Sequence, residues 1–205
     1  MTSDPTPVLE LRQYTLRPGT RDGFVARFER EFVETQQAAG IEVVGTFLDL
    51  DDPDRFVWIR AFASYDARGE ALREFYEGPV WARLRDETNA DLIDSDDVVM
   101  LTPGTPAPPV VAGRHPASGE GVPGRELHVH VWPVASDGAE SELLASLATT
   151  GAIGVASSHP GPNNFPRQPI RADRVVVAIT DTAQKLPGDE LQRLRLGPTA
   201  RSALR

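Results

Sequence analysis

The chain has 205 residues, a formal net charge of -9 and a pI near 4.9, and its 40% hydrophobic and 25% charged residues are typical of a globular protein. An acidic surface repels nucleic acid and anionic membranes, so neither is an expected partner. The absence of cysteine excludes disulfides, thiolate nucleophiles and cysteine-ligated metal sites. Because no apolar stretch approaches the ~20 residues that span a bilayer, and residues 1–5 lack a signal-peptide pattern, we expect a cytoplasmic protein.

The first half of the chain alternates strand and helix patterns. In chain order these predict a strand at residues 8–16, a helix ending near residue 39, strands at 41–50 and 55–63, helices at 66–75 and 80–90, and a strand at 96–101. Phe24, Phe28 and Phe32 carry the helical spacing, and the breaker Gly78-Pro79 separates the last two helices. The order β-α-β-β-α-β predicts a ferredoxin-like unit.

The second half repeats this pattern less completely. Residues 102–124 contain six prolines and five glycines, which is typical of a linker with little capacity to pack. The patterns beyond it predict a strand at 126–134, a helix at 140–148, strands at 152–158 and 174–180, and a poorer helix at 189–204. The second unit therefore lacks a predicted fourth strand.

Short sequence echoes support two copies of one unit. Residues 10–14 (ELRQY) are echoed by residues 126–130 (ELHVH), and Gly78-Pro79 by Gly197-Pro198. We predict an α+β fold of tandem ferredoxin-like units at 1–102 and 125–205, joined by a linker at 103–124, with the second unit degenerate and truncated. A missing strand leaves a sheet edge open, which favours a homodimer, and the barrel could close within one chain or between two.

Three segments of the first half resemble the NIPSNAP family, within the wider dimeric α+β barrel superfamily. They are residues 11–19 (LRQYTLRPG), 56–60 (FVWIR) and 75–81 (FYEGPVW), and residues 164–171 (NFPRQPIR) resemble a segment of bacterial members. The resemblance covers residues 8–101 clearly and implies two ferredoxin-like units facing one another as a barrel. It implies little chemistry, since relatives include cofactor-free oxygenases of aromatic polyketides, haem-degrading enzymes, isomerases, dehydratases and proteins of no known activity.

Strand alternation sorts the side chains onto two faces. One face carries small apolar residues, suited to helices packing above it. The other carries bulky aromatic and ionisable residues, which are Glu10, Arg12, Tyr14, Phe56, Trp58, Arg60, Phe62, Glu126, His128, His130 and Trp132. We expect this second face to line the barrel interior as an aromatic cavity for a flat organic ligand. The alternative is a solid interior, with the arginines paired to Glu10 and Glu126.

Candidate catalytic residues lie on that face. His128 and His130, two apart on a strand, point the same way and could act as general acid and base, bind a metal with Glu126 or His159, or form structural hydrogen bonds. Tyr14 could donate to a carbonyl or enolate oxygen or be structural. Developing negative charge would be held by Arg12 or Arg60.

The remaining candidate ligand contacts are aromatic side chains and a long loop. Trp58, Phe62 and Trp132 are candidate substrate-binding residues. Residues 159–173 are long for a connection between strands, so His159 and Asn164 could belong to a functional lid, or the prolines there could cover a strand edge.

We therefore predict a cofactor-independent enzyme that acts on a hydrophobic, polyketide-like or aromatic small molecule by acid/base chemistry, as in a cyclisation, dehydration or oxygenation of secondary metabolism. No metal or cofactor is predicted, since the chain has no Gly-rich phosphate loop, Gly-x-Ser-x-Gly or His-Glu-x-x-His sequence. The alternative is a non-catalytic protein that binds a small molecule or a partner.

Overall fold

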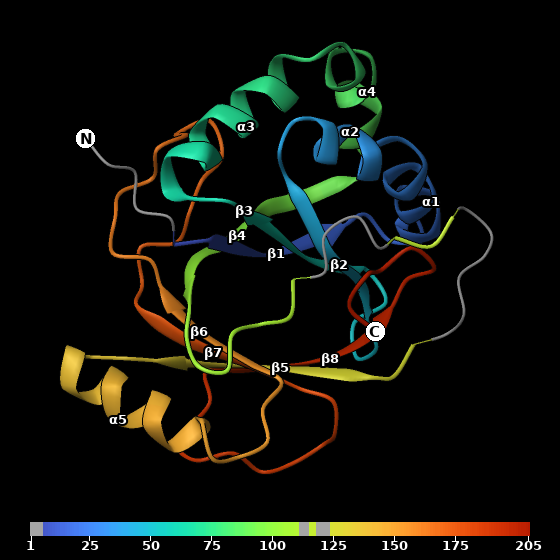
Figure 1. Cartoon of the computed structure of the whole chain (residues 1–205). Helices are drawn as coiled ribbons and strands as arrows, with labels where there is room; N and C mark the ends of the chain where they lie inside the picture. The colour runs from blue at the N-terminus through green and yellow to red at the C-terminus, as the bar shows by residue number, and fades with distance from the viewer. Residues whose placement is uncertain (1–5, 111–114, 118–123) are drawn as a thin grey trace.

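The computed structural model describes residues 6–110, 115–117 and 124–205, so the prediction for residues 1–5 and part of the predicted linker lie outside the described residues. The chain forms a mixed α+β fold (Figure 1). Its elements are β1 (Val8–Leu16), α1 (Arg21–Glu31), α2 (Val33–Ala38), β2 (Glu42–Asp49), β3 (Arg55–Phe62), α3 (Tyr65–Glu77), α4 (Pro79–Ala90), β4 (Leu92–Pro103), β5 (Leu127–Pro133), α5 (Asp137–Leu147), β6 (Gly154–Ser158), β7 (Val175–Thr180) and β8 (Gln192–Pro198).

Local sequence signals set most of the helix ends. The Ser64 hydroxyl accepts a hydrogen bond from the backbone of Ala67 and caps α3, and Pro79 begins α4 directly after Gly78. The predicted single helix ending near residue 39 is divided at Phe32 into α1 and α2. Gly40 follows α2 with a φ of +84°, a conformation that favours glycine.

The eight strands of the described residues form one closed antiparallel barrel with the order β1-β3-β2-β8-β5-β7-β6-β4. The order β4-β1-β3-β2 in the first half is matched by β8-β5-β7-β6 in the second. The halves join where Phe47 of β2 pairs with Pro198 of β8, and where Leu101 of β4 pairs with Ser158 of β6. Since the barrel closes within one chain, the open edge on which the homodimer prediction rested is not there.

The prediction of a helix at residues 189–204 was wrong. Residues 192–198 form β8, which pairs with both β5 and β2. Leu194 and Leu196 are buried while Arg193 and Arg195 point outward, so the apolar residues alternate with the period of a strand. The second half therefore has its fourth strand, and the element it lacks is a helix between β7 and β8.

The barrel interior is filled by aliphatic side chains from both halves. A single buried cluster joins residues of all eight strands, among them Leu9, Leu11, Val57, Ile59, Val99, Leu127, Val129, Ala156, Val177, Ile179, Leu194 and Leu196. The prediction that the bulky aromatic and ionisable face lines the interior was therefore wrong. The interior of an eight-stranded barrel is just wide enough for side chains to fill, and the smaller aliphatic residues fill it.

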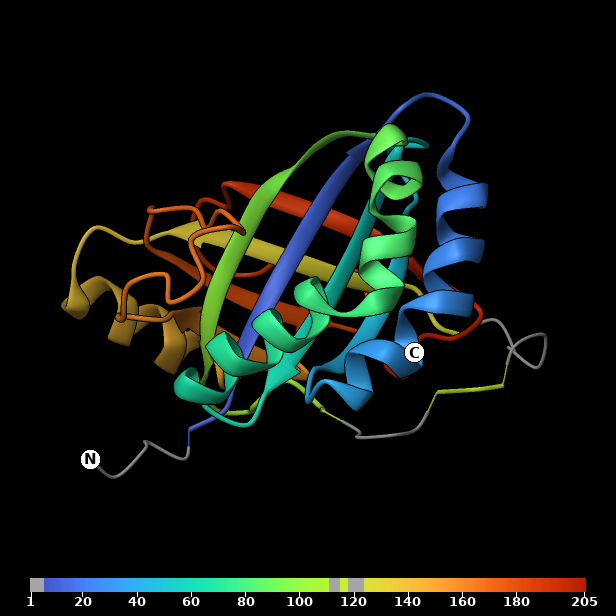
Figure 2. The ribbon, with the colours of Figure 1, turned by 90° about the horizontal axis from the view of Figure 1, so that it is seen from above.

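The bulky face points outward and is covered. Helices α1 to α4 lie over the outer face of the first half, and α5 lies against the second half (Figures 1 and 2). Tyr14, Phe56, Trp58 and Phe62 pack with side chains of α1 to α4, and Trp132 packs with Leu147 of α5. None of the helices in the described part of the chain is both long enough and apolar enough to cross a membrane.

Two irregular segments connect the halves. Part of the predicted linker packs along β6, since the amide of Gly104 donates to the Val155 carbonyl at 2.8 Å and the Val155 amide donates to the Pro106 carbonyl at 2.7 Å. Residues 159–173 reach from the second half to the first, where Phe165 packs in the core beneath the helices. This loop therefore lies beside the helix-covered face of the first half.

Candidate functional site

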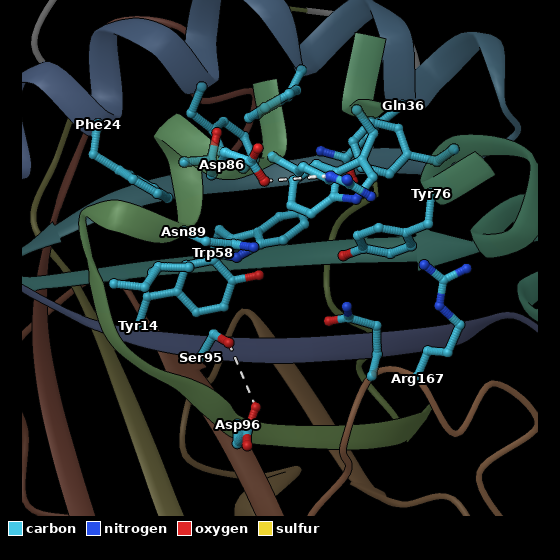
Figure 3. A pocket seen from close by; sticks show the side chains of 18 of the residues that line it. Tyr14, Phe24, Gln36, Trp58, Tyr76, Asp86, Asn89, Ser95, Asp96 and Arg167 are labelled. Carbon is cyan, nitrogen blue, oxygen red and sulfur yellow. Dashed lines mark hydrogen bonds and ion pairs between the residues drawn. The ribbon is translucent and has the colours of Figure 1, made fainter. Parts of the chain in front are cut away.

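A cavity of about 650 Å³ lies between the outer face of the first half and its covering helices (Figure 3). Strands β1, β3 and β4 form one wall, α1, α2, α3 and α4 form the other, and residues 167–169 of the long loop border it. The lining residues are Tyr14, Phe24, Phe28, Phe32, Gln36, Trp58, Phe75, Tyr76, Trp81, Arg85, Asp86, Thr88, Asn89, Leu92, Ser95, Asp96, Arg167, Gln168 and Pro169.

The walls of this cavity are built largely from aromatic rings in mutual contact. Phe28 meets Trp58 edge to face with the ring centres 4.9 Å apart, and Tyr76 meets Trp81 in the same way at 5.0 Å. Rings packed in this way hold one another rigidly. An aromatic wall beside polar groups that can orient a ligand suits a flat, mainly apolar molecule with a polar substituent.

Two tyrosine hydroxyls supply polar groups within the cavity. In Figure 3 the side chains of Tyr14 and Tyr76 extend from opposite sides, with their hydroxyls pointing toward one another. The Tyr14 oxygen accepts a hydrogen bond from Nε of Arg12 at 3.1 Å, so the hydroxyl can donate its own proton in another direction. Burial raises the pKa of Tyr76, which keeps this phenol neutral and able to donate.

Three further buried polar atoms of lining residues have no hydrogen-bond partner among the described residues. They are Nε1 of Trp58, Oε1 of Gln36 and Oγ1 of Thr88, and the three side chains are no more than 4% exposed. A buried polar atom without a partner costs about 1–3 kcal/mol, and a ligand in the cavity could supply the partner.

A cluster of four buried charged side chains lies directly behind the cavity wall, and we call Glu10, Arg12, Arg60 and Arg68 the arginine cluster. Each of the three arginines forms an ion pair with Glu10, at 2.7 Å from Arg12, 2.7 Å from Arg60 and 2.6 Å from Arg68. Burial would raise the pKa of Glu10, but the three guanidinium groups together hold it well below its usual range. The cluster therefore carries three positive charges and one negative charge.

The long loop is fastened to this cluster. Gln168 accepts a hydrogen bond from Nη2 of Arg12 at 3.0 Å, and Asn163 and Asn164 accept from Nη1 of Arg68. The amide nitrogen of Asn164 donates to the carbonyl of Tyr65 at 2.6 Å. Asn164 thus holds the loop in place, and the loop residue that reaches the cavity and also binds the cluster is Gln168.

Charged residues also stand at the mouth of the cavity. Arg85, Asp86, Asp96 and Arg167 are mostly exposed, two of each sign. Within the described part of the chain, no buried carboxylate or histidine lines this cavity. The site therefore has strong hydrogen-bond donors for a ligand oxygen, and its only acidic side chains lie at the entrance.

The structure does not bring the predicted histidines to Tyr14. His128 and His130 lie on β5, on the outer face of the second half, whereas Tyr14 lies on β1. His130 bonds Glu190 through Nδ1 at 3.1 Å and contacts Thr180 through Nε2 at 3.4 Å, and burial lowers its pKa.

The second histidine of the pair and the proposed third metal ligands are also engaged elsewhere. His128 lies 3.3 Å from Glu126, which Arg195 also binds. His159 is stacked on Tyr65 with the ring centres 5.0 Å apart. Among the described residues, no group of three His, Asp or Glu side chains is arranged to hold a metal ion.

The other predicted contacts divide between the halves. Trp58 lines the cavity, Arg12 and Arg60 lie behind its wall, Phe62 packs beneath α3, and Trp132 packs beneath α5. Sequence reasoning missed Gln36, Tyr76 and Thr88, because only strand residues were sorted by face. Tyr76 stands within the FYEGPVW segment that carries the family resemblance, which was the available signal.

Comparison with solved structures defines the class of fold. A provisionally named monooxygenase from Fusobacterium nucleatum covers 97% of this chain and 94% of its own with a TM-score of 0.57 at 7% identity. Another from Lactobacillus acidophilus covers 96% and 97% with a TM-score of 0.53 at 12% identity. The chain therefore has the ferredoxin-like fold of these monooxygenase-type proteins.

The sequence of the first half matches a known protein family. Residues 9–108 match the NIPSNAP family, the family that the sequence of this half resembles. A NIPSNAP family protein of unknown function from Agrobacterium tumefaciens is 25% identical over 49% of this chain and 90% of its own, with a TM-score of 0.45. A comparison with curated proteins gives no match.

Proposed function

We propose that the chain is a cofactor-independent enzyme acting on a hydrophobic, aromatic or polyketide-like small molecule, and that the cavity beneath α1 to α4 is its active site. The observation that carries this proposal is the pair of hydroxyls of Tyr14 and Tyr76, which face one another inside an aromatic cavity in front of the arginine cluster. Hydrogen-bond donors fixed in an enclosed site stabilise an oxygen on which negative charge develops.

The chemistry that fits this arrangement is enolisation of a ketone. The carbonyl oxygen would accept hydrogen bonds from Tyr14 and Tyr76, while a proton leaves the adjacent carbon to water or to Asp86 or Asp96 at the mouth. The electron pair of the broken C–H bond moves to the oxygen as an enolate. An enolate is the shared starting point for cyclisation, dehydration and reaction with oxygen.

This assignment keeps Tyr14 as a catalytic residue, adds Tyr76 as a second donor to the same oxygen, and assigns proton acceptance to water or an aspartate at the mouth instead of His128 or His130. A catalytic role for the histidines stays a prediction, and the geometry that supports it is confined to His130 and Glu190 on the second half. Trp58 and Gln168 are proposed ligand contacts, and Arg12 and Arg60 act from behind the wall.

A second candidate function is non-catalytic binding of the same class of molecule. It is favoured by one observation, that the acidic side chains among the described lining residues are exposed at the mouth rather than buried beside the tyrosines. The solved structures named as monooxygenases share the fold alone, so they do not decide between an enzyme and a binding protein.

The two functions are separated by proton exchange at an activated carbon. With 2-tetralone in heavy water, followed by proton NMR, an enzyme accelerates loss of the signal next to the carbonyl, and a binding protein does not. In the variant Tyr76→Phe we expect the acceleration to fall about 10²- to 10³-fold, as for the loss of one oxyanion donor.

The chain offers a matched control for this substitution. Tyr65 is the third of its three tyrosines, and its exposed hydroxyl donates to the carbonyl of Pro162 outside the cavity. Tyr65→Phe should keep most of the exchange rate. Exchange that is no faster with the wild-type protein than without it would rule out the enolisation proposal.

A further inference from the structure

We propose that the cavity beneath α1 to α4 selects flat aromatic ligands that carry a negatively charged oxygen, a carboxylate or a phenolate, and that this oxygen binds between Tyr14 and Tyr76. The inference rests on the proposed function in that it concerns the same cavity. It adds the charge of the ligand, which neither the family nor the fold specifies.

The first step is the charge of the arginine cluster. Glu10, Arg12, Arg60 and Arg68 have fully buried side chains, and Glu10 pairs with all three arginines. One carboxylate cannot neutralise three guanidinium groups, so two positive charges are left over. Excess buried charge is unfavourable unless an opposite charge lies near it.

The second step is the position of that excess charge. Cζ of Arg12 lies 5.5 Å from the ring centre of Tyr14 and 5.5 Å from that of Trp58, and Cζ of Arg60 lies 5.1 Å from the ring centre of Trp58. Tyr14 and Trp58 both line the cavity. The positive charges are therefore about one ring away from a bound ligand, and a low-dielectric wall screens them little.

The third step is the hydrogen-bonding character of the wall in front of the cluster. Arg12 uses the oxygen of Tyr14 as an acceptor, which leaves the Tyr14 proton pointing elsewhere. Nε1 of Trp58 is a buried donor with no partner among the described residues. Together with the hydroxyl of Tyr76, these groups offer donors to a ligand oxygen, which is the requirement of an anion.

The mouth of the cavity does not oppose this selection. Its charged side chains are two arginines and two aspartates, Arg85, Arg167, Asp86 and Asp96, and their formal charges cancel. The net charge of -9 is carried by the whole chain, and exposed charges beyond about 10 Å are screened at ordinary salt. The arginine cluster therefore dominates the potential inside the cavity.

The test compares two ligands with the same ring and nearly the same shape, the anion 2-naphthoate and the neutral 2-naphthamide. Each is titrated at pH 7 into the full-length protein holding the neutral fluorescent probe N-phenyl-1-naphthylamine, and probe displacement gives the dissociation constant. We expect naphthoate to bind at least about tenfold more tightly than naphthamide, a factor that corresponds to about 1.4 kcal/mol.

A variant then assigns the preference to the cluster. Arg60→Met removes one buried positive charge from behind the cavity wall, so it should weaken naphthoate binding more than naphthamide binding and reduce the ratio of the two affinities. Arg83→Met is the matched control, since Arg83 is exposed and pairs with Glu31 on the surface. If Arg60→Met does not fold, the wild-type ratio still decides the matter.

The failures of the two proposals are distinguishable. A naphthoate to naphthamide ratio near or below one, with both ligands displacing the probe, overturns the charge selection and leaves the cavity as an aromatic site. If neither ligand binds and the probe itself is not held, both the charge selection and the proposed function are wrong.

Discussion

Replacing Glu10 with glutamine tests whether one buried carboxylate holds the arginine cluster together. Four guanidinium nitrogens lie 2.6–2.8 Å from its two oxygens, and an amide can accept on one side only. Its NH₂ group would instead face an arginine. Removing one partner of a buried ion pair costs about 3–5 kcal/mol, and we expect Glu10→Gln to lower the free energy of unfolding by that amount at pH 7.

The pH dependence of this loss follows from the lowered pKa of Glu10. A carboxyl whose pKa is depressed by folding stabilises the folded state above its unfolded pKa, and that stability is lost as the pH falls. Starting from the ordinary value of 4.5, each pH unit removes up to about 1.4 kcal/mol, so at pH 3 the difference between wild type and variant should be about 2 kcal/mol smaller than at pH 7.

Urea unfolding followed by tryptophan fluorescence at pH 7 and pH 3 measures both quantities. Glu31→Gln is the control, because Glu31 pairs with Arg30 and Arg83 on the surface and should matter much less. A loss below about 1 kcal/mol for Glu10→Gln at pH 7, or a difference that does not shrink with acid, would refute the reasoning.

Four further variants test separate parts of the structure. Ile179→Ala opens a space in the barrel interior and should lower the free energy of unfolding in urea by about 2–5 kcal/mol. A far smaller loss would mean that this side chain is exposed and does not belong to the buried cluster. The double variant His128→Ala/His130→Ala should exchange the protons of 2-tetralone at a rate within about twofold of the wild-type rate. A loss as large as the one expected for Tyr76→Phe would indicate that the histidines are catalytic. Since burial lowers the pKa of His130, its contribution to stability is present above pH ~6.5 and is lost as the pH falls, so His130→Gln should flatten the unfolding profile below that pH. Asn164→Ala should speed proteolytic cleavage within residues 159–173, with Asn163→Ala as a comparison, and unchanged cleavage would contradict its fastening role.

The fold of the first half could be predicted because its signals are local. Phe24, Phe28 and Phe32 mark a helix by spacing, and Gly78-Pro79 marks the boundary between α3 and α4. β8 was missed because Leu191 and Leu194, three residues apart, fit a weak helical pattern in a short window. The alternation of Leu194 and Leu196 with Arg193 and Arg195 was the better guide, because β8 buries only the face that points into the barrel.

The sequence placed the candidate cavity on the bulky face of the strands and expected that face to turn inward, whereas in the structure it turns outward beneath the helices. Alternation identifies which side chains share a face, and Arg12, Tyr14, Trp58 and Arg60 do share one. It does not say which face turns inward, because that depends on the width of a barrel formed by residues far apart in sequence. Val57 and Ile59 are small aliphatic residues. Their size suggested that helices pack over them, but it suits the interior of a narrow barrel equally well.

The most direct test of the central claim is where a ligand binds. A crystal structure of the full-length protein soaked with 2-naphthoate should show the ring in the cavity beneath α1 to α4, which Trp58, Tyr76 and Trp81 line, with the carboxylate between Tyr14 and Tyr76. Density instead beside His128 and His130, or in the separate pocket lined by His159 and Arg174, would contradict a functional site beneath α1 to α4.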